Sequence, residues 1–159
     1  MPDTMDSRSH ASMQHLLPAR HRQDGTWRFT VPPVEGSVPW VRHAVRDLLR
    51  RRRVPLGDEL MFAVELVLSE LVTNGVRHAA LLTPRVGVEV TLQDGRLRLG
   101  VEDGHPYRPR ALEASPDRHE IGGRGLLLVK AVALEAGGDC GVTPTAAGGK
   151  VVWVTLPLR

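Results

Sequence analysis

The segment at 65–80, ELVLSELVTNGVRHAA, constrains the fold most, because it combines the apolar period of a buried helix with polar groups on one side. At roughly 100° per residue, four polar residues fall on one stripe of that helix: Glu70, Thr73, Asn74 and Arg77. Burying a carboxylate and a carboxamide among leucines and valines costs roughly several kcal/mol unless a polar partner meets them. The stripe therefore predicts a ligand or a polar neighbour at this face.

Glu70 and Asn74 are one helical turn apart, so a side-chain oxygen from each can point into the same cavity. The Asn74 oxygen is a hard, neutral ligand that suits Mg²⁺, which takes its other oxygens from waters and phosphates. Glu70 would then orient or deprotonate a nucleophile that attacks a phosphoryl group. The alternative is that Glu70 and Arg77 solvate an exposed helix face. In that case Asn74 and Gly75 end the helix, and this motif alone does not separate the two interpretations.

The chain has 159 residues, and its 42% apolar content is enough for the core of one domain. Cys140 is its only cysteine, which excludes an intrachain disulfide and a cysteine-based metal cluster and is typical of a reducing cytoplasm. No run approaches the roughly 18 to 20 apolar residues that span a bilayer, and the N-terminus lacks the apolar segment of a signal peptide. We therefore expect a cytoplasmic protein with no membrane partner.

The formal charge of +3 and the isoelectric point near 9.7 come partly from four consecutive arginines at 50–53. They follow the helical pattern WVRHAVRDLL, and cations at the C-terminal end of a helix suit its dipole. A solvated helix end is therefore the favoured interpretation. A nucleic-acid patch that includes Arg46 is the minor alternative, because the basic charge comes without a docking motif.

The N-terminal part of the chain predicts a tail followed by one domain. Residues 1–24 are polar and show no sustained period, which indicates disorder, and 25–159 form the domain. The alternation TWRFTV predicts a strand at 26–31, which the following two prolines end.

Two helices are expected next. Ser37 is a suitable N-cap for a helix that runs to about Arg53. A break at Pro55 follows, and Asp58 can cap the next helix, which carries the polar stripe to about His78.

A β-hairpin is the clearest local signal in the chain. Alternating runs at 86–93 and 96–103 are joined by an Asp-Gly pair, which favours a two-residue turn. The second strand leads directly into Asp103. Two further strands are expected at 139–142 and 150–156, joined by a turn with two glycines.

A glycine-rich turn follows a long loop at 104–121, which is rich in Pro, Arg, Asp and His. Gly122, Gly123 and Gly125 precede an apolar helix, LLLVKAVALEA, that is expected to begin at Leu126. Backbone N–H groups and the dipole at such a helix start attract phosphate. The alternative is that the glycines only permit a tight bend before a core helix.

Asp103 has one functional and one structural interpretation. A carboxylate accepts a hydrogen bond from an exocyclic amine, which would select adenine over guanine. Alternatively, Asp103 ends the strand and its side chain accepts from a nearby turn N–H. The order and spacing of the helix pair, the acid and the glycine turn favour the functional interpretation of all three.

Taken together, the motifs resemble a known family. ELVTNGVRHA, VEDGHP, GGRGLLLV and GGKVVWVTL occur in the order that is typical of the serine-protein-kinase and anti-sigma-factor branch of the GHKL ATPases. The resemblance covers about 26–156. It implies a Bergerat-type α/β (α+β) two-layer sandwich, with a mixed, mostly antiparallel sheet covered on one face by helices.

The resemblance also implies a site for ATP and Mg²⁺. Glu70 matches the catalytic base, Asn74 matches the residue that holds Mg²⁺, and Asp103 matches the acid that binds adenine. The other expected nucleotide-binding residues match the same motifs or adjoin them: Arg77, His78, Gly104, Gly122, Gly123, Arg124, Gly125 and Leu126.

The sequence departs from the family pattern at two positions. The acid motif usually reads DxGxG, but here His105 stands where the first of these glycines is expected. Val151 is the position where we expect the threonine that many relatives carry after the late glycine. A helix for histidine phosphorylation is not visible, so a complete sensor histidine kinase is not expected.

Two functions follow from the resemblance. The first is an ATP-dependent serine/threonine protein kinase of the anti-sigma-factor type, which phosphorylates a small antagonist protein and also sequesters a sigma factor. The second is a binding module without catalysis, in which nucleotide sets the shape of the lid and a partner protein recognises that shape. The family commonly pairs, so a homodimer is a further expectation.

Overall fold

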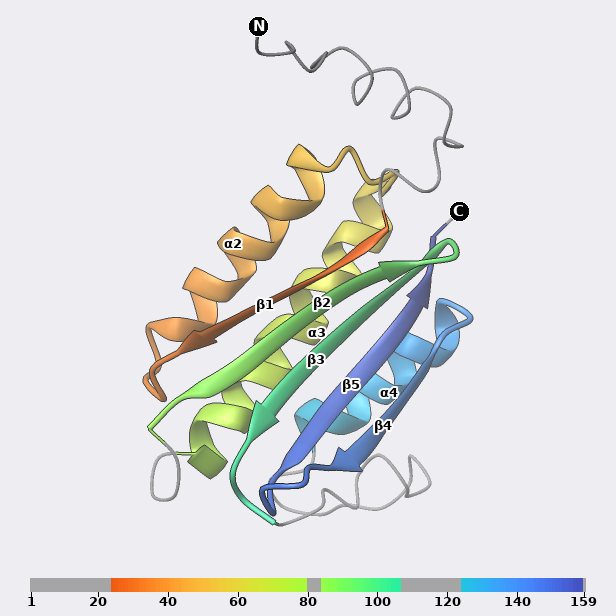
Figure 1. The fold of residues 1–159 in the computed structure, drawn as a ribbon. Helices are drawn as coiled ribbons and strands as arrows, with labels where there is room; N and C mark the ends of the chain where they lie inside the picture. The colour runs from red at the N-terminus through yellow and green to blue at the C-terminus, as the bar shows by residue number, and fades with distance from the viewer. Residues whose placement is uncertain (1–23, 80–83, 107–123, 159) are drawn as a thin grey trace, which may run out of the picture.

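Three helices cover one face of a five-stranded sheet (Figure 1). The computed structural model describes residues 24–79, 84–106 and 124–158. The elements in chain order are β1 (Gly25–Val31), α2 (Ser37–Arg51), α3 (Asp58–Ala79), β2 (Val86–Gln93), β3 (Arg96–Asp103), α4 (Arg124–Glu135), β4 (Asp139–Pro144) and β5 (Lys150–Pro157). The expected tail lies outside the described residues, except for Asp24.

The strand order is β1-β2-β3-β5-β4, and every pairing is antiparallel. The two-layer α/β sandwich is therefore confirmed. The expected mixed sheet is not, because no two neighbouring strands among those described are parallel. The consecutive strands β3 and β4 run in the same direction, but β5 lies between them and is antiparallel to both, so they do not form a parallel pair.

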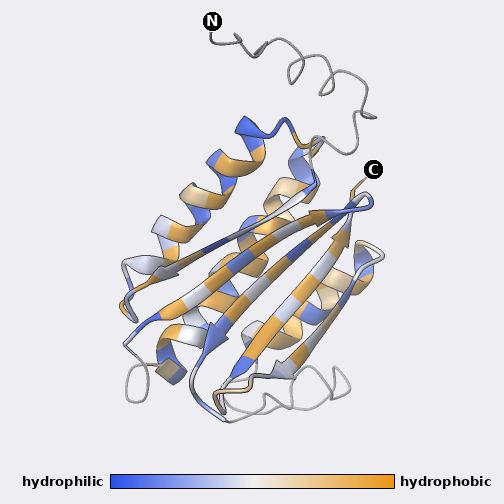
Figure 2. Cartoon of the chain, viewed as in Figure 1, coloured by the Kyte–Doolittle hydropathy of each residue, from blue (hydrophilic) through white to orange (hydrophobic). Residues whose placement is uncertain are grey.

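The core lies between the sheet and the helices because the strands alternate strictly. In β2, for example, Val86, Val88, Val90 and Leu92 are buried, while the residues between them face the other side. The same alternation is visible as bands along the strands in Figure 2. No helix covers the outer face of the sheet in the part of the chain that the structure describes.

The helix starts differ slightly from the sequence prediction. Ser37 is the first residue of α2 instead of its cap, and its Oγ donates a hydrogen bond to the Pro32 carbonyl at 2.7 Å. Asp58 likewise lies in the first turn of α3, where its charge suits the positive end of the helix. Val41, Val45 and Leu49 of α2 are buried at four-residue spacing, as an amphipathic helix requires.

The helix α3 does not end at Asn74 and Gly75, so the structural alternative for this pair is wrong. It continues to Ala79, and Gly75 faces the sheet. A Cβ at Gly75 would lie only 2.9 Å from the Val101 Cγ1 atom, so glycine lets the helix approach the sheet closely. Close approach carries the last turn of α3 to the ends of β3 and β5.

Two tight turns fix the register within the hairpins β2–β3 and β4–β5. Asp94 and Gly95 have φ angles of 51° and 72°, which confirms the tight hairpin between β2 and β3. Between β4 and β5, Gly148 has a φ angle of 88°. In the register between β3 and β5, which no turn connects directly, Asp103 at the end of β3 is paired with Lys150 at the start of β5.

Two arginines in or just after α2 contact other parts of the fold. Arg46 forms an ion pair with Glu65 of α3, and the Arg52 guanidinium lies 4.7 Å from the centroid of the Trp27 ring. Arg50 and Arg51 are exposed in the last turn of the helix, as expected for a solvated end. None of the described helices is long and apolar enough to cross a membrane.

Candidate functional site

A buried ion pair lies where β3 ends and β5 begins. Asp103 and Lys150 have 3% and 0% of their surface exposed, and the Lys150 Nζ atom lies 3.0 Å from the Asp103 Oδ1 atom. The same ammonium lies 3.0 Å from the His78 Nδ1 atom and 3.3 Å from the His105 carbonyl oxygen. Residues from α3, β3 and β5 therefore meet at one cation.

One Asp103 oxygen is satisfied and the other is not. Oδ1 accepts from Lys150 and also from the His105 backbone N–H at 2.8 Å, as the structural interpretation of this aspartate predicted. Oδ2 is buried and has no hydrogen-bond partner among the residues that the structure describes. An unsatisfied buried acceptor costs about 1–3 kcal/mol, and more when it is charged. The strand-end bond therefore does not account for the whole carboxylate.

A second unsatisfied polar atom belongs to Asn74. Its Nδ2 atom is buried without a partner, one helical turn before His78 on α3. Rotation of the carboxamide would place its oxygen in the same position. The stripe on α3 therefore presents one amide and the end of β3 presents one carboxylate oxygen, and both lack partners within the described residues.

The His78 ring is held in its neutral form. Burial lowers its pKa below the ordinary value of 6.5, and the charge of Lys150 lowers that pKa further. Because the Lys150 ammonium can only donate, Nδ1 of His78 accepts and the ring proton is on Nε2. The His78 and His105 rings lie with their centroids 5.4 Å apart.

Glu70 lies against the first turn of α4. A Cβ added to Gly125 would overlap the Glu70 Oε2 atom, so the carboxylate occupies the space that a side chain would fill. The helix α4 begins at Arg124, which makes Gly125 part of its first turn instead of the preceding loop. This places Glu70 one turn before Asn74 on α3 and beside the N-terminal end of α4.

The remaining predicted residues divide into three groups. Arg77 and Arg124 are exposed, and Gly104 continues the chain from Asp103. The Leu126 side chain is buried in the core, so only its backbone is available to a ligand. Gly122 and Gly123 lie outside the described residues.

Sequence reasoning missed Lys150 because it considered only Val151, where many relatives carry threonine, as the unusual residue of this segment. In the structure Val151 is paired with Glu102 on the outer face of the sheet, whereas Lys150 faces inward to Asp103. The signal was present in the alternation KVVWVTL, because Lys150 has the same parity as the buried Val152 and Val154. Finding its partner also required the register between β3 and β5.

The arrangement fits a purine nucleotide. The free Asp103 oxygen suits an exocyclic amine, and the Asn74 amide suits a hydrated cation or a phosphate-bound water. No three His, Cys, Asp or Glu side chains in the described ranges are grouped so as to hold a metal ion. A cation at Asn74 would therefore take most of its ligands from phosphates and water.

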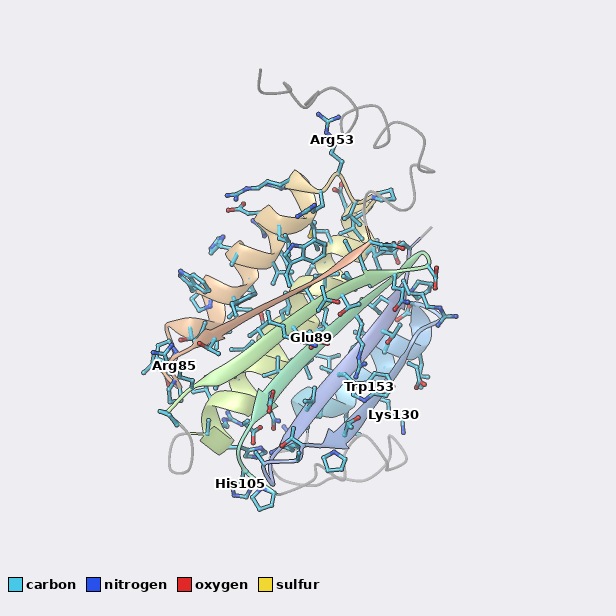
Figure 3. All side chains as sticks on the ribbon, viewed as in Figure 1. Arg53, Arg85, Glu89, His105, Lys130 and Trp153 are labelled. Atoms are coloured by element: carbon cyan, nitrogen blue, oxygen red, sulfur yellow. The ribbon has the colours of Figure 1, made fainter. Side chains whose placement is uncertain are left out.

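Other parts of the surface are separate from this cluster. Figure 3 shows His105 at the end of the molecule opposite Arg53, so the arginine run is distant from the site. A hollow of about 310 Å³ on the outer face of the sheet is lined partly by Gly87 and Gly100. Another, of about 550 Å³, lies between α3 and α4 and is lined partly by Phe62.

The family model described as Histidine kinase-like ATPase domain matches residues 31–156. The comparison with curated proteins found no match.

Solved structures share the fold at low identity. The RsbU and RsbW domains of Rv1364c from Mycobacterium tuberculosis match at 19% identity and a TM-score of 0.57, covering 85% of this chain and 34% of that one. Full-length ShkA in complex with AMPPNP matches at 21% identity and a TM-score of 0.53, and the match covers 99% of this chain and 40% of that one. The histidine kinase domain of the Erythrobacter litoralis EL346 blue-light activated histidine kinase matches at 19% identity and a TM-score of 0.50. This match covers 95% of this chain and 82% of that one. The chain thus spans about a third of the length of the first.

Proposed function

Because the chain belongs to the Histidine kinase-like ATPase domain family, we propose that it binds ATP with Mg²⁺ and phosphorylates a serine or threonine of a small partner protein. The observation that carries this proposal is the buried Oδ2 atom of Asp103, which has no hydrogen-bond partner in the described ranges, at a site that also presents the Asn74 amide. A carboxylate oxygen of this kind accepts from the exocyclic amine of adenine. Guanine presents a carbonyl oxygen at the corresponding place, so the site favours ATP over GTP.

The phosphate end of the nucleotide is assigned to α3 and α4. Asn74 would hold Mg²⁺ through its side-chain oxygen, and bound Mg-ATP would supply the phosphoryl group together with a cation that screens its charge. Arg124 and the backbone N–H groups in the first turn of α4 favour an anion at this position. Gly122 and Gly123 match the family's turn that contacts the phosphates, and Gly104, next to Asp103, would line the nucleotide site.

Glu70 is the proposed base. It lies one turn from Asn74 and beside the start of α4, so a partner hydroxyl that enters there would meet its carboxylate. Glu70 would accept the hydroxyl proton as the serine or threonine oxygen bonds to the γ-phosphorus of ATP. The bond from that phosphorus to the bridging β-γ oxygen breaks, and ADP leaves. The protein contributes position and charge, which is the main requirement of phosphoryl transfer.

The anti-sigma-factor type is the proposed branch. The motifs ELVTNGVRHA and GGRGLLLV support it, and so does the likeness in fold to a structure that contains an RsbW domain. The partner would then be a small phosphorylatable antagonist protein, and a sigma factor would be the second partner. A cytoplasmic location and a homodimer belong to the same proposal.

The alternative is an ATP-binding regulatory module without phosphotransfer. His105 replaces a glycine that the family pattern places after the acid, and this favours a site that holds nucleotide without turnover. The two functions differ in their dependence on Glu70. A binding module keeps ATP-dependent partner binding when Glu70 is changed to Gln, whereas a kinase loses product formation.

The first test is calorimetric titration of Mg-ATP and Mg-GTP into the wild type and the Asp103→Asn variant. We expect ATP binding by the wild type, weaker GTP binding, and loss of ATP binding in the variant. Asp94→Asn is the matched control, because Asn-Gly also suits the turn between β2 and β3. Absence of ATP binding by the folded wild type would refute the proposal.

The second test separates the two functions. Radiolabelled ATP is incubated with wild type, Glu70→Gln or the control Glu102→Gln, whose side chain is exposed on the outer face of the sheet. The partner is a co-purified small protein with an accessible serine or threonine. A kinase labels it with the wild type and the control but not with Glu70→Gln.

A further inference from the structure

Lys150 is the only cationic side chain with no exposed surface in the described part of the chain. The whole sequence contains two lysines and nineteen arginines, so the buried cation is of the type that this chain rarely uses. A buried charge is costly unless it is paired and hydrogen-bonded. The position therefore calls for an explanation in terms of its partners.

The partners of Lys150 account for all three of its donors. The ammonium reaches a carboxylate on β3, an imidazole on α3 and the His105 carbonyl, which follows β3. An ammonium is compact and donates in three directions, whereas a guanidinium is planar and donates through a rigid fork. Three acceptors around one point therefore suit lysine and not arginine.

We propose that Lys150 is a positioning residue of the nucleotide site, which fixes Asp103 so that Oδ2 is its open acceptor and fixes His78 with its proton on Nε2. The nucleotide part of this inference rests on the proposed function. The part that concerns His78 does not, because it follows from the contacts of the ammonium alone.

Two consequences follow from the contacts. Without Lys150, either Asp103 oxygen can take the bond from the His105 N–H, so the acceptor is no longer fixed. The His78 ring would also lose the donor that keeps Nδ1 unprotonated. Among the described residues, the charged or titratable groups that shift the His78 pKa include Lys150, Asp103, His105 and Arg77, and of these four only Asp103 favours the protonated ring.

The test that is independent of nucleotide is histidine NMR. Long-range ¹H–¹⁵N spectra of the full chain report the His78 tautomer, and a pH titration reports its pKa. We expect the Nε2–H tautomer in the wild type. In Lys150→Met we expect a mixture of tautomers and a raised His78 pKa. Lys130→Met is the matched control, because it changes the other lysine, on α4, and should leave His78 unchanged. An unchanged tautomer in Lys150→Met would overturn the inference.

A second variant covers loss of folding. Lys150→Met leaves the Asp103 carboxylate buried and unpaired, so the double variant Lys150→Met with Asp103→Asn removes both charges. The tautomer remains informative there, since the ammonium is absent and the ring can protonate either nitrogen. Retention of the Nε2–H tautomer in the double variant would also contradict the inference.

Calorimetry with Mg-ATP tests the nucleotide part. We expect Lys150→Met to weaken ATP binding about tenfold, the loss that corresponds to one misplaced charged hydrogen bond, and Lys150→Arg not to restore it. Equal ATP affinity in wild type and Lys150→Met would overturn this part. If the wild type itself does not bind ATP, the proposed function fails, whereas the NMR result still decides the role of Lys150 toward His78.

Discussion

The carboxylate of Glu70 on α3 lies in the space that a side chain at Gly125 on α4 would occupy. The two helices pack together there, and the absence of a Cβ at Gly125 determines where the carboxylate can lie. Gly125 thus leaves room for the Glu70 carboxylate, in addition to any role in the turn before α4.

Gly125→Ala should separate stability from activity. Alanine is favoured over glycine in a helix by roughly 0.5–1 kcal/mol, and the overlapping atom is the mobile end of a side chain. We therefore expect an unchanged or raised free energy of unfolding in urea, together with a loss of phosphotransfer because Glu70 is displaced. Gly36→Ala, where a Cβ meets no atom within 4 Å, is the control. Full activity of Gly125→Ala would show that the position of Glu70 is not critical.

Gly149→Ala, in contrast, should lower the free energy of unfolding. Its Cβ would overlap the Asp103 carbonyl oxygen, which is backbone and cannot move aside as a side chain can. We expect a loss of about 1–3 kcal/mol in the free energy of unfolding, the usual range for overpacking. Urea denaturation of this variant beside Gly57→Ala, where a Cβ meets open space, measures the difference. Equal stability of the two variants would contradict the contact.

His78 should make stability depend on pH in the acidic range. Its pKa is lowered by burial and by Lys150, so the unfolded chain takes up the proton first as the pH falls. The contribution of neutral His78 is complete above about pH 6.5 and declines as the pH falls toward the lower folded pKa. We expect His78→Gln to flatten the change in urea midpoint between about pH 7.5 and 5.5. The exposed His43→Gln should not, and identical slopes would contradict the prediction.

Cys140 should react slowly with iodoacetamide. Burial raises the pKa of its thiol, and the neighbouring Asp139 carboxylate raises that pKa further. Because the thiolate is the reactive form, alkylation near neutral pH should be slower in the folded protein than in urea. Asp139→Asn should lower the pKa and speed the folded-state reaction, while Asp94→Asn should not. A folded-state rate equal to the rate in urea would contradict this prediction.

The local elements could be predicted because their signals are contained within short segments. The helical period at 65–80 and the Asp-Gly turn before β3 each need only neighbouring residues, and both are confirmed. Asp103 was placed at the end of its strand for the same reason. The helix starts at Ser37 and Asp58 were displaced by one position, because a polar residue suits both the cap and the first turn.

The sequence by itself determined which segments form helices and strands, because period and turn residues are local properties. The same local patterns predicted Glu70, Asn74 and Asp103 as candidate site residues. Tertiary structure alone decided that Lys150 and Asp103, 47 residues apart, form a buried ion pair that also includes His78. That pair depends on the register between β3 and β5 and on the close approach of α3 to the sheet at Gly75. Both are set by the packing of the whole core, which no single segment of the chain contains.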